Sequence, residues 1–217
     1  MSSDLEIVMS KGNASERSYR GISPEQRIKV RREAFLQAGI RLFGTTGYRA
    51  TTVRDLCAEA KLTDRYFYES FSGTEDLLAA AYTSIMGEIE QALSRQIQHA
   101  GADTDRHQVL ETFIRAMREP TVARIVLFEV LGVSERIDNL YQQNNLRFCN
   151  LLLSGLSRLY GGLKPVSSEL YVCMGIIGAI NQMAVCWYLS GYRDPIEVLV
   201  ESAEQVIMGC SLGIDPG

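Results

Sequence analysis

The stretch from Thr51 to Phe71 constrains the fold of this chain more than any other. It reads TTVRDLCAEAKLTDRYFYESF, and its pattern predicts two short helices joined by a tight turn at Lys61. Thr52 can cap the first helix, because its hydroxyl can accept a bond from a free amide of the first turn. Asp55, three residues later, can return a bond to the cap, which is a variant of the capping box. Thr63 is expected to cap the second helix.

The second helix of this pair has two unlike faces. Phe67 and Phe71 lie four residues apart, so they share the side that is expected to be buried. The side chains left to point elsewhere are those of Asp64, Arg65, Tyr66 and Tyr68. Hydroxyls, a guanidinium and a helix N-terminus suit phosphate oxygens and base edges of DNA. Two interpretations are open at this point: a helix-turn-helix that enters the major groove, and a helical hairpin of some unrelated bundle.

The flanking sequence favours the first interpretation. Residues 28–43 have a helical pattern, and Gly47 follows as a suitable stop because glycine tolerates a left-handed backbone. A further helix start lies at Thr74, where acids favour the positive end of the helix dipole. From Arg27 to Ala81 the chain resembles the N-terminal domain of the TetR family of bacterial transcriptional regulators. The segments FLQAGIRLFGTTGYRATTVRDLCAEAKLT and DRYFYESFSGTEDLL carry this resemblance and follow each other without a gap.

The resemblance implies that residues 63–68 make most of the DNA contacts, with Tyr68 gripping a phosphate. Three positions depart from the family pattern. Lys61 stands where a glycine is usual, so a non-glycine residue must accept the turn geometry. Thr74 stands where a lysine often contacts phosphate, and Glu69 places an acid on the recognition helix, where it should face away from phosphates or weaken binding. The candidate DNA-binding residues are Arg49, Thr52, Arg54, Thr63, Asp64, Arg65, Tyr66, Tyr68 and Thr74.

Charge is distributed unevenly along the chain, whose net charge is −4. Residues 17–73 hold 11 Lys and Arg against 6 Asp and Glu, whereas residues 74–217 hold 10 against 17. A basic N-terminal quarter on an acidic body indicates that one end meets nucleic acid, although ordinary variation in surface charge could give the same contrast.

Residues 1–22 are polar and lack the apolar segment of a signal peptide. We interpret them as a flexible N-terminal arm. Its Lys11, Arg17 and Arg20 either reach DNA or are incidental charges of a disordered tail. The predicted organisation is this arm, a helix-turn-helix domain over residues 23–73, and a ligand-binding and dimerisation domain over residues 74–217.

The rest of the chain reads as helices, so the predicted fold is all-α, with a three-helix DNA-binding domain followed by a helical domain. The expected helices after residue 73 are 74–100, 105–118, 120–131, 134–160, 167–189 and 195–212. The run from Leu170 to Tyr192 carries no charge and is long enough to span a membrane. Asn181 and Gln182 in its middle argue against that.

Small residues at helical spacing on this run let two helices approach closely. In the family resemblance the last two helices pack against the same pair of a second subunit, so we expect a homodimer and no membrane insertion. The last helix is expected to contribute an apolar stripe of Ile196, Leu199, Val200, Ala203, Val206, Ile207 and Cys210.

The middle helices are expected to enclose a small-molecule site, because they combine large apolar side chains with a few polar ones. The alternative for each aromatic residue is that it simply fills a core. Glu129, inside an apolar run, lies either at a solvent edge or in a cavity. Trp187 is the only tryptophan. The candidate ligand-binding residues are Phe113, Met117, Phe128, Glu129, Phe148, Asn181, Met183 and Trp187.

No catalytic residue, metal site or cofactor is predicted. The two histidines, His99 and His107, have no nucleophile or ligand partner in the sequence pattern, and the five cysteines form no CxxC pair. The expected function is that of a cytoplasmic repressor that binds a double-stranded operator as a homodimer and is released by a small, apolar effector. The alternatives are a DNA-binding regulator with a protein partner or no effector, and a helical interaction protein without DNA binding.

Overall fold

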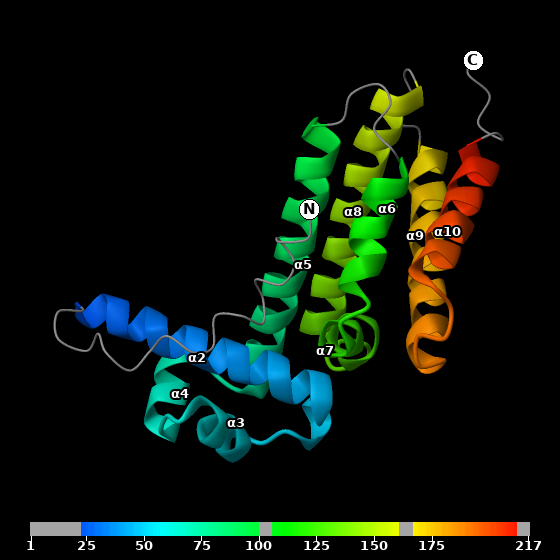
Figure 1. Ribbon diagram of the computed structural model, residues 1–217. Helices are drawn as coiled ribbons and strands as arrows, with labels where there is room; N and C mark the ends of the chain where they lie inside the picture. The colour runs from blue at the N-terminus through cyan, green and yellow to red at the C-terminus, as the bar shows by residue number, and fades with distance from the viewer. Residues whose placement is uncertain (1–22, 100–105, 161–166, 212–217) are drawn as a thin grey trace.

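The computed structural model describes residues 23–99, 106–160 and 167–211, all of them in helices, turns and short connections. The residues of the expected N-terminal arm, 1–22, lie outside the described ones. Helices α2, α3 and α4 form a small head, and α5 leads from it into a body of roughly parallel and antiparallel helices (Figure 1). The all-α fold with an N-terminal helix-turn-helix and a C-terminal helical domain is thereby confirmed.

Helix α2 spans Pro24–Thr45 and therefore begins four residues earlier than the expected start at residue 28. The reason is a complete capping box: Gln26 N donates to Ser23 Oγ at 3.2 Å, and Ser23 N donates to Gln26 Oε1 at 3.1 Å. Pro24 occupies the first helical position, where its missing N–H is harmless. The helix ends before Gly47, whose φ of 100° needs a glycine, as the sequence predicts.

Helices α3 (Val53–Ala60) and α4 (Asp64–Ser70) form the helix-turn-helix. The expected capping box between Thr52 and Asp55 is present, with Asp55 N donating to Thr52 Oγ1 at 3.3 Å and Thr52 N donating to Asp55 Oδ2 at 2.9 Å. Lys61 adopts the left-handed backbone that its position demands, at φ 55° and ψ 40°. Thr63 precedes α4 as expected, but its side chain makes no capping bond.

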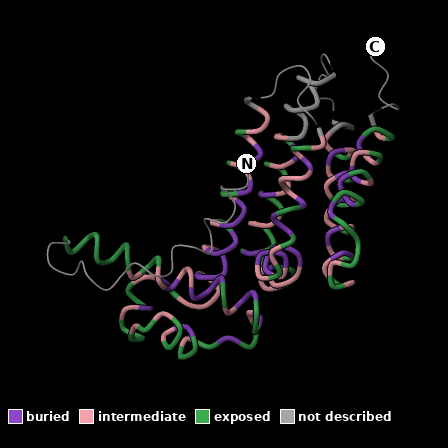
Figure 2. The backbone as a smooth tube through the Cα atoms, viewed as in Figure 1, coloured by how far each residue is buried: buried purple, intermediate pink, exposed green. Residues whose placement is uncertain are grey.

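A continuous apolar core joins the head to the body. Phe35 of α2 meets Phe67 of α4 edge to face, with ring centroids 5.3 Å apart, and Phe71 lies 6.1 Å from Phe67. All three rings are buried, and the same cluster continues through Leu77 and Tyr82 on α5. Figure 2 shows buried segments where the head meets the start of α5. The head is thus packed on the start of α5 and is not attached through a free linker.

The body consists of α5 (Thr74–His99), α6 (Arg106–Ala116), α7 (Pro120–Arg124), the π-helix η3 (Ile125–Glu129), α8 (Glu135–Tyr160), α9 (Ser167–Leu189) and α10 (Ile196–Ser211). The single helix expected over residues 120–131 is a short α-helix that continues as a π-helical segment. Such wider turns often occur at functional positions. Both α7 and η3 lie against α2 of the head.

A second apolar cluster forms where α6, α9 and α10 meet. Most of the stripe expected to face a second subunit belongs to this cluster, because Ile196, Leu199, Val200, Ala203 and Ile207 are buried within the chain. The assignment of these five residues to a subunit interface was therefore wrong, whereas Val206 and Cys210 are half-buried. Helical periodicity gives the buried face of α10 correctly, but not the partner that buries it.

The outer face of α9 is exposed and apolar. It carries Tyr171, with 74% of its surface exposed, and Leu189, with 68% exposed. By length and hydropathy alone the segment Leu170–Leu189 could cross a membrane, with a mean hydropathy of 1.6. In this fold α9 packs against α8 on one side and α10 on another.

Candidate functional site

The recognition helix α4 presents its first turn to solvent. The Arg65 side chain is 83% exposed, and Tyr68 is 62% exposed. Asp64 Oδ1 accepts a hydrogen bond from the Arg65 amide at 2.8 Å, which ties the acid to the helix start. Phe67, between these residues, anchors the opposite face in the core. The helix therefore holds Asp64, Arg65 and Tyr68 on one accessible side, as expected.

The Tyr66 side chain is less exposed to solvent than the sequence suggests. It is half-buried, and the Arg31 guanidinium from α2 lies 4.1 Å from the centre of its ring. Arg31 also forms an ion pair with Glu69 at 3.6 Å, and Glu69 accepts a bond from Arg65 Nε at 3.1 Å. The acid on the recognition helix is thus paired with two arginines. Sequence reasoning missed Arg31, because its partner residues lie on a different helix.

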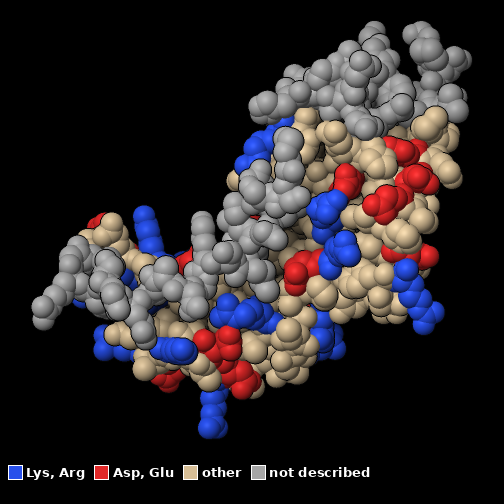
Figure 3. All heavy atoms as spheres, in the orientation of Figure 1, with Lys and Arg blue, Asp and Glu red and all other residues tan. Residues whose placement is uncertain are grey.

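The other candidate DNA contacts surround the start of α3 and α5. Arg49, Arg54 and Thr63 are exposed, whereas Thr74 is half-buried at the first position of α5. The Thr52 hydroxyl donates to Asp55 Oδ2 at 2.6 Å. This bond and the Thr52 amide hold the pKa of the Asp55 carboxyl below its usual range. Basic side chains project from the head in Figure 3.

The body contains an apolar cavity between α5, α6, η3, α8 and α9. It measures about 90 Å³. No lysine, arginine, histidine or carboxylate is among the described residues that line it. The lining residues are Tyr82, Met86, Leu93, Ile97, Val109, Leu110, Phe113, Val126, Tyr141, Asn145, Phe148, Leu151, Ile177, Ile180 and Asn181.

Three of the predicted ligand-binding residues line this cavity. Phe113 and Phe148 pack edge to face in its lining, with ring centroids 6.2 Å apart, and Asn181 contributes an amide from α9. Asn145 on α8 is the other amide in the lining.

Four other predicted apolar residues lie elsewhere, which corrects the sequence expectation. Met117 is fully buried in the core that joins head and body. The Phe128 ring packs 5.2 Å from that of Tyr188, and Met183 packs on the α6–α9–α10 cluster. Trp187 Nε1 donates to the Asp194 carbonyl at 2.8 Å, so its indole supports the turn before α10 and not the cavity.

Glu129 is also misplaced by the sequence interpretation, since it lies in neither a cavity nor open solvent. Its Oε1 accepts from Arg124 Nε at 2.8 Å, and its Oε2 accepts from the Tyr48 amide at 2.7 Å. Its side chain is 15% exposed. Glu129 therefore joins the body to the head.

Several lining residues were missed although the sequence carried a signal. Tyr82, Met86, Leu93 and Ile97 recur at helical spacing along α5, so they share one face. That spacing is equally typical of a core face, which is why it did not single out a cavity. Burial raises the pKa of the Tyr82 phenol, which keeps it neutral.

Comparison with known proteins agrees with this geometry. Residues 35–81 match the sequence model of the bacterial regulatory proteins of the tetR family. The HTH-type transcriptional regulator HbdR of Aromatoleum sp. (strain CIB) is 24% identical over 164 residues, which cover 73% of this chain and 70% of the relative.

Solved structures share the fold over most of their length. FadR from Bacillus subtilis, determined in complex with stearoyl-CoA, has a TM-score of 0.69 at 17% identity, covering 84% of this chain and 99% of that one. A putative transcriptional regulator from Pseudomonas aeruginosa PAO1 has a TM-score of 0.67 at 21% identity, covering 92% and 97%.

The matched segment contains the whole helix-turn-helix, in which α4 is exposed at Arg65 and Tyr68. The fold of the body is likewise that of these regulators. The chain therefore carries a DNA-binding domain of the TetR type and is similar, over most of its length, to TetR-family transcriptional regulators.

Proposed function

We propose that this regulator is a cytoplasmic, homodimeric repressor that binds a near-palindromic operator and is released by an apolar small molecule. The observation that carries the proposal is the apolar cavity between the helices of the body, next to a DNA-binding head. In this proposal residues 23–73 bind DNA, and residues 74–217 bind the effector and the second subunit.

The DNA contacts are assigned from exposure and chemistry. Arg65 is the candidate for base recognition, because an exposed guanidinium at a helix start can bond guanine in the major groove. Tyr68 is the candidate for a phosphate contact. Arg49 and Arg54, both exposed, add positive charge toward the DNA backbone.

The cavity favours an extended, apolar effector with an uncharged polar group. Its lining on α5 runs from Tyr82 to Ile97, which at 1.5 Å per residue corresponds to about 22 Å of helix. Asn145 and Asn181 are the amides available to a polar group. Because the described lining holds no charged side chain, an ionised headgroup would stay outside.

An acyl chain fits this description. The structurally similar FadR from Bacillus subtilis was solved with stearoyl-CoA, a long acyl chain on a charged carrier. We therefore choose an acyl thioester of this kind as the first effector to test.

The proposed subunit interface is the outer face of α9 and α10. Exposed residues recur on α9 at helical spacing from Tyr171 through Gly175, Gly178, Gln182 and Cys186 to Leu189. On α10, Val198 is 47% exposed and Met208 is 46% exposed. An apolar patch of this kind on two neighbouring helices is typical of a subunit interface.

The test combines effector binding with operator release. We expect stearoyl-CoA to raise the melting temperature of the protein and to lower its affinity for an operator selected from the source genome. Asn181→Leu should weaken effector binding by up to about tenfold, the loss of roughly one hydrogen bond, and leave operator affinity unchanged. Asn139→Leu, at an exposed amide on α8 outside the cavity, is the matched control.

Each contrary outcome points to an alternative. Operator binding that no acyl thioester changes would favour a regulator with another effector, a protein partner or none. If Asn181→Leu binds an active acyl thioester as tightly as the parent protein does, the effector does not bind in this cavity.

A further inference from the structure

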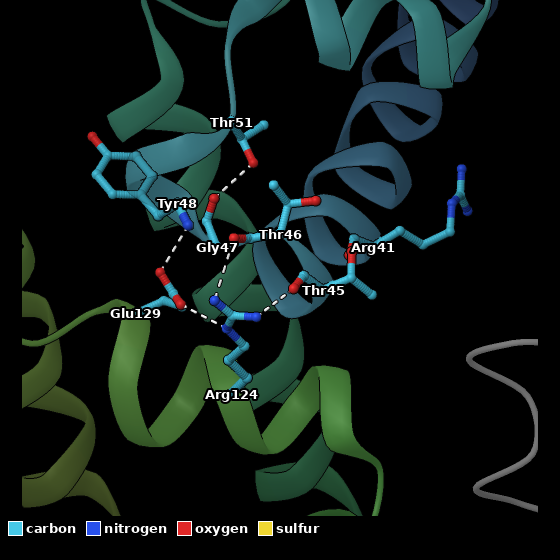
Figure 4. A network of polar contacts seen from close by, with 8 residues as sticks. All are labelled: Arg41, Thr45, Thr46, Gly47, Tyr48, Thr51, Arg124 and Glu129. Carbon is cyan, nitrogen blue, oxygen red and sulfur yellow. Dashed lines mark hydrogen bonds and ion pairs between the residues drawn. The ribbon is translucent and has the colours of Figure 1, made fainter.

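Two side chains of the body hold the end of helix α2 and the segment that follows it (Figure 4). Arg124, the last residue of α7, donates to the Thr45 carbonyl and, at 3.3 Å, to the Thr46 carbonyl. Glu129, the last residue of η3, accepts from the Tyr48 amide at 2.7 Å. The two side chains pair with each other at 2.8 Å. We call this arrangement the Arg124–Glu129 clamp.

The clamp satisfies groups that the head leaves open. The last carbonyls of an α-helix have no partner within the helix and carry partial negative charge. Helix α2 has no basic residue in its own last turn. Arg124 therefore supplies from the body the cation that the C-terminus of α2 lacks. Glu129 likewise supplies the acceptor for the first amide of the turn that leads to α3.

The fit around the clamp is close. A Cβ placed on Gly47 would lie 2.7 Å from Arg124 Nη2 and 3.1 Å from Glu129 Oε1, and Gly47 also has a φ of 100°. The Gly47 carbonyl accepts from Thr51 Oγ1 at 2.7 Å. The segment between α2 and the helix-turn-helix is thus fixed on both sides. The Arg124 and Glu129 side chains are 30% and 15% exposed, so water screens their pairing only in part.

The effector cavity and the clamp share one short segment. Val126, which lies between Arg124 and Glu129 in sequence, lines the cavity. The cavity measures about 90 Å³, whereas sites for drug-sized ligands occupy about 300–1,000 Å³. A long apolar effector must therefore push the lining apart. Displacement of η3 at Val126 would move both residues of the clamp.

We infer that Arg124 and Glu129 are the positioning residues through which occupation of the cavity changes the placement of the DNA-binding head. This inference rests on the proposed release by an effector. A conformation with a narrow cavity disfavours the effector. Because effector and operator exclude each other in a repressor, the same conformation is the one that binds the operator. The clamp, which belongs to that conformation, therefore stabilises the operator-binding state.

Substitutions in the clamp are expected to change operator binding and stearoyl-CoA binding in opposite directions. Glu129→Gln and Arg124→Gln each remove the ion pair. Both should weaken operator binding and strengthen stearoyl-CoA binding, each by about 5–150-fold, the usual range of coupling between sites. The double variant should lose little more than either single variant, because the two residues act as one unit. Arg115→Gln is the matched control, since it breaks the Arg115–Glu111 pair, both partners of which lie on α6.

The measurements are fluorescence anisotropy with the selected operator, calorimetry with stearoyl-CoA, and the melting temperature of the full-length protein. Weaker operator binding with tighter effector binding, seen in both clamp variants and not in Arg115→Gln, supports the inference. Loss of both affinities together with a lowered melting temperature would show a structural role only and overturn it.

Failure of the effector proposal is a separate result. If stearoyl-CoA leaves the parent protein unchanged, that proposal fails. The role of the clamp is then tested by measuring operator affinity and the hydrogen exchange of the Tyr48 amide. The inference predicts faster exchange and weaker operator binding in Glu129→Gln, and unchanged operator affinity in both clamp variants would refute it.

Discussion

Gly44→Ala is expected to destabilise this protein, although the same change in most helices is stabilising. Gly44 lies in the last turn of α2, where the helix crosses α7. A Cβ at this position would lie 2.6 Å from Thr121 Cα and 2.7 Å from the Thr121 carbonyl oxygen. These are backbone atoms, so no side-chain rotation can relieve the overlap, and the two helices must move apart.

The expected magnitude follows from two opposing terms. Replacing glycine by alanine inside a helix stabilises by about 1 kcal/mol, whereas overpacking a close contact costs about 1–3 kcal/mol. The net effect at Gly44 therefore ranges from none to a loss of about 2 kcal/mol. Gly87→Ala in α5 is the matched control, because a Cβ there meets nothing within 4 Å. It should gain about 1 kcal/mol.

Urea unfolding of both variants, followed by circular dichroism at one fixed protein concentration, measures the difference. We expect Gly87→Ala to be more stable than Gly44→Ala by about 1–3 kcal/mol. Fixed concentration matters because association of subunits contributes to stability. Equal stabilisation by the two substitutions would refute the close contact between α2 and α7, and with it the rigid support of the head.

The remaining predictions concern DNA, assembly and pH. Arg65→Ala should cost about 1–3 kcal/mol of operator binding and relax preference at one position per half-site. Tyr68→Phe should weaken binding to operator and scrambled DNA alike, because a phosphate contact carries no base information; anisotropy titrations across a salt series separate the two effects. Leu189→Glu on the exposed face of α9 should convert the proposed dimer to the 24.2 kDa monomer in light scattering, and retention of a dimer mass would exclude this face. A hydrogen bond from Arg136 holds the pKa of the Asp76 carboxyl below its usual range, so this pair stabilises the fold above about pH 4 and the contribution is lost as pH falls through the lowered pKa. Arg136→Gln should therefore lower the free energy of unfolding at pH 7 by up to about 1 kcal/mol. It should also make the melting temperature fall less steeply as the pH is lowered below about 4. An unchanged dependence on pH would show that this pair does not stabilise the fold.

Local features of the head were predictable because they depend on neighbours in sequence. The capping box of Thr52 and Asp55, the left-handed Lys61 and the buried pair of Phe67 and Phe71 all follow from residues within four positions of each other. The earlier start of α2 was missed, although Ser23 and Gln26 carry the signal of a capping box.

Contacts between distant segments were not predictable in the same way. Glu129 was expected at a solvent edge or in a cavity, because nothing in its surroundings along the chain indicates the Tyr48 amide as its partner. Trp187 was expected in the cavity on size and apolar character alone, and its bond to the Asp194 carbonyl is specific to the turn before α10. The cavity itself depends on α5, α6, η3, α8 and α9 together, so the spacing on α5 could not distinguish it from solid core.

Selection of genomic DNA fragments by the full-length protein, followed by footprinting with and without stearoyl-CoA, tests the central claim most directly. We predict enrichment of a near-palindromic sequence and protection of two half-sites about one helical turn apart or somewhat more, on one face of the duplex. Protection should disappear when the acyl thioester is added. Enrichment of no common sequence, or protection that persists at saturating acyl thioester, would contradict the account of a dimeric repressor released through its apolar cavity.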